Sequence, residues 1–258
     1  FAVQQQSQQH QIYSAVHSNG EYAPEGSMQF MVSVQNKNGH VCGGFLISEV
    51  FVVTAAHCDI GLKHVILGEH NLKNSNVKTI KISNQYKHKN YSDVGHGYDI
   101  MLLKVSIYLR NPEGLLIIHA CSFKLFLFLP AGPTCCSVAG WGKTERINGL
   151  VDDLMVANVP IIDHNDCKQS WGGLPPNVIC AGGKSTDFHD VCSLQGDSGG
   201  PLVCNGKAVG IVSFYRNRNC TYPDVPNVYT DIREYVQWFN NLIMNKMSKK
   251  LVKTCFHI

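Results

Sequence analysis

The chain has 258 residues, 44% of them hydrophobic and 16% charged, and a formal net charge of +3. This length allows one large all-β domain or two small ones around a sizeable core. The small net charge and scattered basic residues argue against nucleic-acid binding, and the longest apolar run, Leu125 to Leu129, is far too short to span a membrane.

The eleven cysteines are unusual for a reducing compartment and favour an oxidising, extracellular or vesicular one. The sequence contains no CxxC pair of the kind that binds zinc. We predict neither a metal nor a cofactor. Two glycosylation sequons, Asn90-Tyr91-Ser92 and Asn219-Cys220-Thr221, agree with that compartment. We predict a secreted or secretory-granule protein whose signal peptide is not present in this chain.

The N-terminal segment, 1–16, opens with a glutamine-rich stretch that cannot bury enough apolar surface to become ordered. We predict that this segment is disordered. From Phe30 onward, short apolar runs alternate with turn residues, which is typical of a barrel or sandwich. A first hairpin is predicted from Phe30–Gln35 and Val41–Ile47, with its turn at Asn38-Gly39.

The clearest hairpin joins Leu202–Cys204 to Ala208–Phe214 through Asn205-Gly206. Only the end of the chain indicates a helix, capped by Thr230 or Asp231. Apolar residues then recur at helical spacing, namely Ile232, Tyr235, Val236, Phe239, Leu242 and Ile243. We interpret this stripe as core packing.

Three motifs carry catalytic chemistry. Gly196–Pro201 presents the hydroxyl of Ser198 and backbone N–H groups in one tight turn. A serine needs a base to take its proton, and the base needs an acceptor on its other nitrogen. Thr54–Cys58 supplies such a histidine, and Asp99–Leu103 supplies a carboxylate at the start of an apolar strand.

Taken together, and in the order His, Asp, Ser, these motifs resemble those of the chymotrypsin-like serine proteases. The resemblance covers roughly residues 17–243 and includes three further segments, Val41–Ile47, Ala139–Gly142 and Pro226–Thr230. Asp99–Leu103 and Val178–Gly183 are most similar to the granzyme and mast-cell protease branch. The implied fold is all-β, with two six-stranded antiparallel β-barrels that meet near residues 115–135 and a C-terminal α-helix, followed by a basic tail, 244–258.

The resemblance also implies the role of each site residue. His57 is the general base and then the general acid, Asp99 orients it, and Ser198 attacks the scissile carbonyl to form an acyl-enzyme. The backbone N–H groups of Gly196 and Ser198 form the oxyanion hole. The buried carboxylate of Asp197 binds the new N-terminal amine after activation.

Substrate contacts are implied in the same way. Ser213, Phe214 and Tyr215 pair with the substrate backbone as an added strand. Asp190 stands at the floor of the specificity pocket and favours Lys or Arg. Tyr215 and Asn227 replace the glycines of open-pocket members and hinder bulky side chains.

The resemblance assigns four disulfides, Cys42 with Cys58, Cys136 with Cys204, Cys167 with Cys180, and Cys192 with Cys220. Three cysteines are left over, Cys121, Cys135 and Cys255. Because three is odd, at least one thiol is free or pairs with another chain. Cys135 could replace Cys136 as the partner of Cys204.

The sequence departs from the family at the activation segment. His17-Ser18 stands where two aliphatic residues are expected, and Ser193-Leu194 looks like an insertion beside the specificity pocket. An unpaired Asp197 would be costly to bury. We therefore keep two hypotheses, a serine endopeptidase and a catalytically impaired homologue that acts as a binding protein. Expected partners are protein or peptide substrates, protein protease inhibitors and, with weak support from the basic tail, a polyanion.

Overall fold

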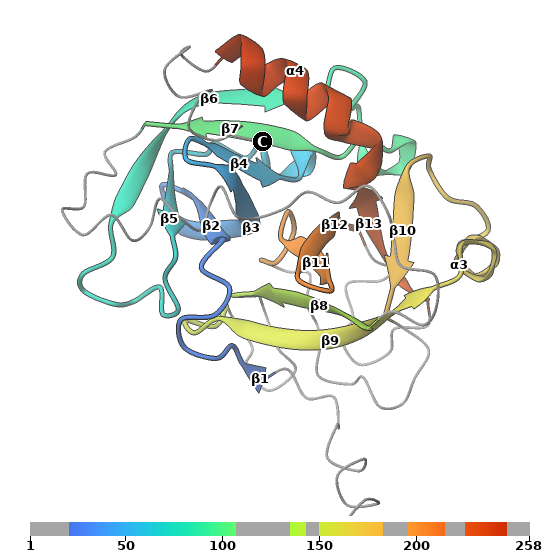
Figure 1. The fold of residues 1–258 in the computed structure, drawn as a ribbon, viewed down its shortest axis with the longest axis horizontal. Helices are drawn as coiled ribbons and strands as arrows, with labels where there is room; N and C mark the ends of the chain where they lie inside the picture. Colours follow the sequence, from blue (N-terminus) through green and yellow to red (C-terminus); the bar gives the residue numbers. More distant parts are fainter. Residues whose placement is uncertain (1–20, 107–134, 143–149, 183–195, 215–224, 247–258) are drawn as a thin grey trace, which may run out of the picture.

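The computed structural model describes residues 21–106, 135–142, 150–182, 196–214 and 225–246. They form two β-barrels, with helix α4 lying across the first (Figure 1). The first is a closed barrel in the order β2-β3-β4-β7-β6-β5. Its strands are β2 (Met31–Asn36), β3 (Gly39–Ser48), β4 (Phe51–Thr54), β5 (His64–Leu67), β6 (Thr79–Lys87) and β7 (Met101–Val105).

The second barrel follows the order β9-β10-β13-β12-β11-β8 and closes through the pairing of β8 with β9. Its strands are β8 (Cys135–Gly140), β9 (Met155–Ile162), β10 (Val178–Ala181), β11 (Pro201–Cys204), β12 (Lys207–Phe214) and β13 (Asn227–Asp231). The short strand β1 (Glu21–Tyr22) pairs with β9. All these pairings are antiparallel, so the predicted fold of two six-stranded barrels is confirmed.

Both predicted hairpins are present. Between β11 and β12, Asn205 and Gly206 have φ angles of 51° and 72°, the positive values that a two-residue hairpin turn favours. Between β2 and β3 the turn lies one residue earlier than predicted, because Asn36 already pairs with Gly39. Lys37 and Asn38 are therefore the turn residues.

The predicted C-terminal helix is also present. It begins as the 3₁₀ turn η3 (Ile232–Tyr235) and continues as α4 (Val236–Lys246). The cap is Asp231, whose side chain accepts a hydrogen bond from the Arg233 N–H. Phe239 and Ile243 are buried in the cluster that fills the first barrel, as the apolar stripe predicted.

A second helix was not predicted, α3 (His164–Trp171). Asp163 caps it by accepting from the N–H groups of Asn165 and Asp166, and Gly172 ends it in the left-handed conformation. Among the described helices, none is long and apolar enough to cross a membrane.

Three of the four assigned disulfides form, Cys42–Cys58, Cys136–Cys204 and Cys167–Cys180. Cys136, not Cys135, is thus the partner of Cys204. The Cys192–Cys220 pair, Cys121 and Cys255 lie outside the described residues, as do segment 1–16, the tail beyond Lys246 and nearly all of the predicted barrel boundary.

Candidate active site

The first pair of predicted site residues lies within the first barrel. His57 belongs to the short 3₁₀ turn η1 (Ala56–Cys58), and Asp99 comes two residues before β7. One carboxylate oxygen of Asp99 accepts from the His57 backbone N–H at 2.9 Å, and the other lies 2.7 Å from His57 Nδ1. A carboxylate can only accept here, so Nδ1 carries a proton, and in the neutral ring Nε2 keeps its lone pair.

Asp99 is almost completely buried, with 1% of its surface exposed. The second barrel supplies two of its hydrogen bonds. Ser213 Oγ, on β12, donates to the carboxylate at 2.5 Å, and Thr230 Oγ1, on β13, donates to the Asp99 backbone carbonyl at 3.0 Å. These contacts fix the carboxylate that orients His57.

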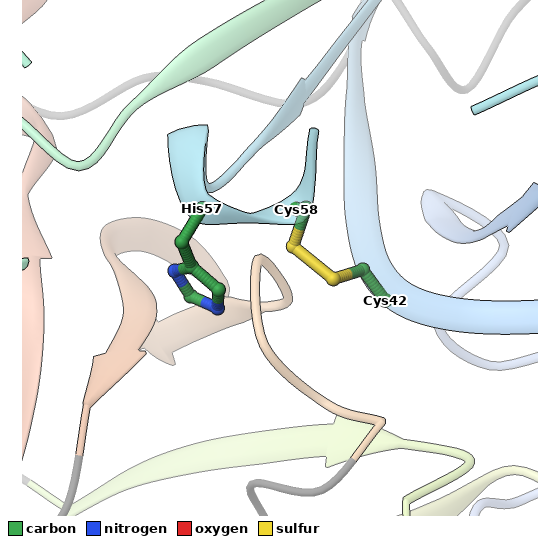
Figure 2. A group of neighbouring side chains, drawn as sticks. All are labelled: Cys42, His57 and Cys58. Atoms are coloured by element: carbon green, nitrogen blue, oxygen red, sulfur yellow. A yellow bond between two sulfur atoms is a disulfide. The ribbon is translucent and has the colours of Figure 1, made fainter. Parts of the chain in front are cut away.

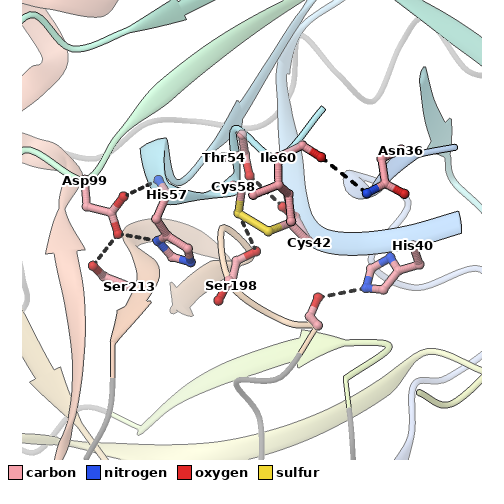
Figure 3. The surroundings of a disulfide bond; sticks show 12 residues. Asn36, His40, Cys42, Thr54, His57, Cys58, Ile60, Asp99, Ser198 and Ser213 are labelled. Carbon is pink, nitrogen blue, oxygen red and sulfur yellow. Dashed lines mark hydrogen bonds and ion pairs between the residues drawn. A yellow bond between two sulfur atoms is a disulfide. The ribbon is translucent and has the colours of Figure 1, made fainter. Parts of the chain in front are cut away.

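Ser198 comes from the second barrel, in the turn that precedes β11. Its carbonyl accepts from the Gly43 N–H of β3 at 2.9 Å, which ties this turn to the first barrel. Figure 3 shows Ser198 on the side of the His57 imidazole opposite to Asp99. His57 Nε2 therefore lies on the side where the serine stands.

Glycine is required where the Ser198 turn meets the first barrel. Gly199 has a φ of +85°, and a Cβ there would lie 2.1 Å from Thr54 Oγ1 and 2.7 Å from the Gly43 carbonyl oxygen. A Cβ on Gly43 would in turn lie 3.1 Å from the Gly200 backbone. The backbone of the Ser198 turn and the backbone of β3 approach so closely that there is no room for a Cβ between them.

Asp197 is buried beside the Ser198 turn, against β8 and the residues after it. Its carboxylate accepts a hydrogen bond from the Gly142 N–H at 2.7 Å. Burial raises the pKa of Asp197 to about 8, and the Gly142 hydrogen bond offsets only part of this effect. In the part of the chain that the structure describes, no cation pairs with this carboxylate.

A chain of side-chain hydrogen bonds reaches the same turn from the first barrel. It runs from His64 Nε2 to Gln35 Oε1 (3.0 Å), from Gln35 Nε2 to Ser33 Oγ (3.0 Å), from Ser33 Oγ to His40 Nδ1 (2.8 Å), and from His40 Nε2 to the Gly196 carbonyl (2.7 Å). The carbonyl can only accept, so His40 donates from Nε2 and accepts at Nδ1. Burial lowers the pKa of His40 to about 4, which agrees with this neutral ring.

Cys42, His57 and Cys58 bring potential metal-ligand atoms within 4.8 Å of one another (Figure 2). The two sulfur atoms are bonded to each other at 2.05 Å, so neither is a thiolate. The disulfide instead ties η1, and with it His57, to β3. The Cys42–Cys58 disulfide is therefore a structural anchor for the turn that carries His57.

The predicted substrate-binding residues are only partly described. Phe214 ends β12, and its ring packs edge-on against Trp171 of α3 with centroids 5.2 Å apart. Asn227 opens β13 opposite Ala181 of β10 and is partly exposed. Asp190 and Tyr215 lie outside the described residues.

Sequence reasoning missed several residues that hold this site. Trp171, whose indole N–H donates to the Pro226 carbonyl at 2.9 Å, supports Phe214. Ser33, Gln35 and His40 were not singled out, although Ser33, a polar residue between Val32 and Val34 in a predicted strand, was a signal. Thr230 was considered as a helix cap and as the end of the segment Pro226–Thr230, and not as a partner of Asp99.

The sequence and the fold have clear counterparts among known proteins. The family described as Trypsin matches residues 17–239. Serine protease 1 of Rattus norvegicus is 37% identical over 236 residues, which cover 87% of this chain and 88% of that protein. Trypsin-1 of Salmo salar is 36% identical over 211 residues, 80% of this chain and 82% of that protein. The solved structure of neuropsin, a serine protease expressed in the limbic system of mouse brain, aligns with a TM-score of 0.72 and 29% identity over 87% of this chain and 98% of that chain.

Proposed function

Because this chain belongs to the trypsin family of serine endopeptidases, we propose that His57, Asp99 and Ser198 are its catalytic triad. The observation that carries the proposal is the double contact of the Asp99 carboxylate with the His57 backbone and Nδ1. This contact leaves His57 Nε2 as a base on the side of Ser198.

The proposed reaction follows from these positions. His57 Nε2 takes the Ser198 hydroxyl proton as Ser198 Oγ attacks the scissile carbonyl, and Asp99 stabilises the imidazolium that forms. The imidazolium then returns the proton to the leaving amine, which gives an acyl-enzyme on Ser198. A water molecule, deprotonated by His57, hydrolyses the ester and restores the serine.

The proposed oxyanion hole consists of the backbone N–H groups of Gly196 and Ser198. Such donors stabilise the charge that develops on the substrate oxygen, each by about 3 kcal/mol. Two contacts with the first barrel support this assignment, because His40 binds the Gly196 carbonyl and Gly43 binds the Ser198 carbonyl. These contacts hold the peptide units that follow Gly196 and Ser198, which are next to the units that carry the two proposed donors.

A fluorophosphonate probe tests the proposed triad directly, because it reacts only with an activated serine in a formed oxyanion hole. We expect labelling of Ser198, located by mass spectrometry of the modified peptide. Ser198→Ala is the matched control and should remain unlabelled. Labelling of a different residue, or equal labelling of the control, would refute the assignment.

One observation favours the alternative of a catalytically impaired homologue that acts as a binding protein. Asp197 is buried with no cationic partner among the described residues, and an ion of this kind is expensive to keep in the interior. A protein that folds, binds peptides and is not labelled by the probe would favour this alternative.

We propose that four residues determine the substrate specificity. Asp190 at the pocket floor would select Lys or Arg by charge pairing, while Tyr215 and Asn227 would narrow the pocket. Phe214, supported by Trp171, would contact the substrate beside Ser213. Comparing kcat/KM for peptides that differ only in Lys, Arg or Phe at the cleaved position tests this proposal.

The setting of the protein is also proposed. Three disulfides support export, and the similarity of Asp99–Leu103 and Val178–Gly183 to granzymes supports granule storage. Protein protease inhibitors and, through the basic tail, a polyanion are further proposed partners. Localisation of a tagged full-length protein would separate granule storage from direct release.

A further inference from the structure

The sequon Asn90-Tyr91-Ser92 lies in an exposed turn between β6 and η2 (Val94–His96). The Tyr91 N–H donates to the His88 carbonyl at 3.0 Å and closes this turn. The Asn90 backbone N–H donates to His88 Nδ1 at 3.3 Å, while its side-chain amide has no hydrogen-bond partner among the described residues. The amide is thus free for modification.

The turn is held firmly although it is exposed. The His88 ring stacks on Tyr98 with centroids 5.0 Å apart and an angle of 5°, and it meets Tyr235 and Trp238 edge-on at 5.4 Å. The His88 N–H donates to the Ile100 carbonyl at 3.1 Å. Asn90 therefore projects from a fixed base and does not depend on a flexible loop for its exposure.

The same turn contains an exposed lysyl bond, Lys89–Asn90. Lys89 and Asn90 are both exposed, and the segment that follows them leads directly to Asp99. Burial, followed by the charges of Asp99 and Asp93, raises the pKa of Tyr91 to about 12. A cut at Lys89–Asn90 would free one end of the segment that holds Asp99.

We propose that Asn90 carries an N-linked glycan and that this glycan protects the Lys89–Asn90 bond. In the modification, the Asn90 Nδ2 displaces the pyrophosphate of a lipid-linked oligosaccharide. The N–C bond to the sugar forms, the sugar C–O bond to pyrophosphate breaks, and Nδ2 loses one proton. A protease must seat the residue after the scissile bond in its cleft, and a glycan on that residue prevents it.

The chain contains two matched control bonds, Lys37–Asn38 and Lys73–Asn74. Both have an exposed lysine followed by an exposed asparagine in a turn. Neither asparagine begins a sequon, because Asn38 is followed by Gly39-His40 and Asn74 by Ser75-Asn76. Protection by a glycan should therefore be confined to Lys89–Asn90.

The proposal assumes that the protein is exported, as proposed above. The test does not depend on natural export. The full chain with Ser198→Ala, which prevents self-digestion, is directed into a eukaryotic secretory pathway by a heterologous signal peptide. Ser92→Ala abolishes the sequon, and Ser92→Thr keeps it. Mass spectrometry identifies the glycan, and limited digestion with a lysine-specific protease measures cleavage of the three Lys–Asn bonds.

We expect a glycan on Asn90 in the protein that retains Ser92 and in the Ser92→Thr variant, and none after Ser92→Ala. Loss of the glycan should speed cleavage at Lys89–Asn90 by about tenfold or more and change cleavage at the two control bonds by less than about twofold. An unmodified Asn90 in the secreted protein would overturn the site. Equal cleavage with and without the glycan would overturn its protective role.

Discussion

Single residues at the site are constrained by groups far away in the sequence. Asp99 is held by Ser213 and Thr230, and the carbonyl of Gly196 is held by His40. Each contact joins one barrel to the other. The consequence is that the proposed base and nucleophile keep their relative position only while the two barrels stay docked.

The first prediction at this scale concerns His57. Replacing His57 by Ala removes the only base beside Ser198 in the proposed triad, and we expect kcat for peptide hydrolysis to fall by about 10⁴-fold or more. The fold should persist, because His57 is partly exposed. Turnover and thermal unfolding of the purified variant check both statements, and undiminished hydrolysis would contradict the triad.

The second prediction concerns Asp197 and pH. Burial raises its pKa from 3.8 to about 8, so between these values the folded chain holds a proton that the unfolded chain releases. The free energy of unfolding should therefore fall as the pH rises from about 4 to about 8. Asp197→Asn cannot ionise and should lack this contribution. Chemical denaturation of both proteins across this pH range measures it, and parallel profiles would contradict the assignment.

At the scale of elements, chain turns decide how closely the barrels approach. Gly199 and Gly206 both have positive φ angles, +85° and +72°. A Cβ on Gly199 would collide with Thr54 and Gly43, whereas a Cβ on Gly206 would have no atom within 4 Å. Gly206 is thus required only for the backbone conformation of its hairpin. Gly199 is required both for its backbone conformation and for the close packing of the Ser198 turn against the first barrel.

This contrast gives a matched pair of variants. We expect Gly206→Ala to lower the free energy of unfolding by about 1 kcal/mol, the cost of the backbone conformation. Gly199→Ala should lower it by about 3 kcal/mol or more, because overpacking is added to that cost. Urea denaturation of both variants gives the comparison. Equal losses would mean that the Ser198 turn can move away from the first barrel.

The elements also show what the sequence could predict. The Asn205-Gly206 hairpin and the C-terminal helix were predictable because their apolar periodicity and caps are local signals. Helix α3 was missed because it is short and only Cys167 is buried on it, although Asp163 and Gly172 mark its ends. The hydrogen-bond chain from His64 to Gly196 could not be predicted, since its side chains meet only when β2, β3 and β5 pair, and its last contact needs both barrels.

At the scale of the whole molecule, the two barrels share their site, and the Ser198 turn lies where they meet. The first barrel holds this turn through Gly43 and His40, while Gly142 of the second barrel binds Asp197. The three described disulfides join β3 to η1, β8 to β11, and α3 to β10. Among the described residues, the buried carboxylate of Asp197 still lacks a cation.

The last prediction concerns a variant that supplies this cation. Replacing His17 by Ile and Ser18 by Val, with Val16→Lys as a cleavable residue before them, creates an aliphatic N-terminus whose amine can pair with Asp197 after cleavage. Burial of the aliphatic side chain contributes about 1.5 to 3 kcal/mol, and the ion pair removes the penalty of an isolated carboxylate. We expect the active-site titre to rise about tenfold on cleavage, and the pH dependence contributed by Asp197 to disappear. The uncleaved variant is the control, because it has the same side chains without the new amine. Equal titres before and after cleavage would mean that the Ser198 turn is already ordered by contacts such as those of His40 and Gly43.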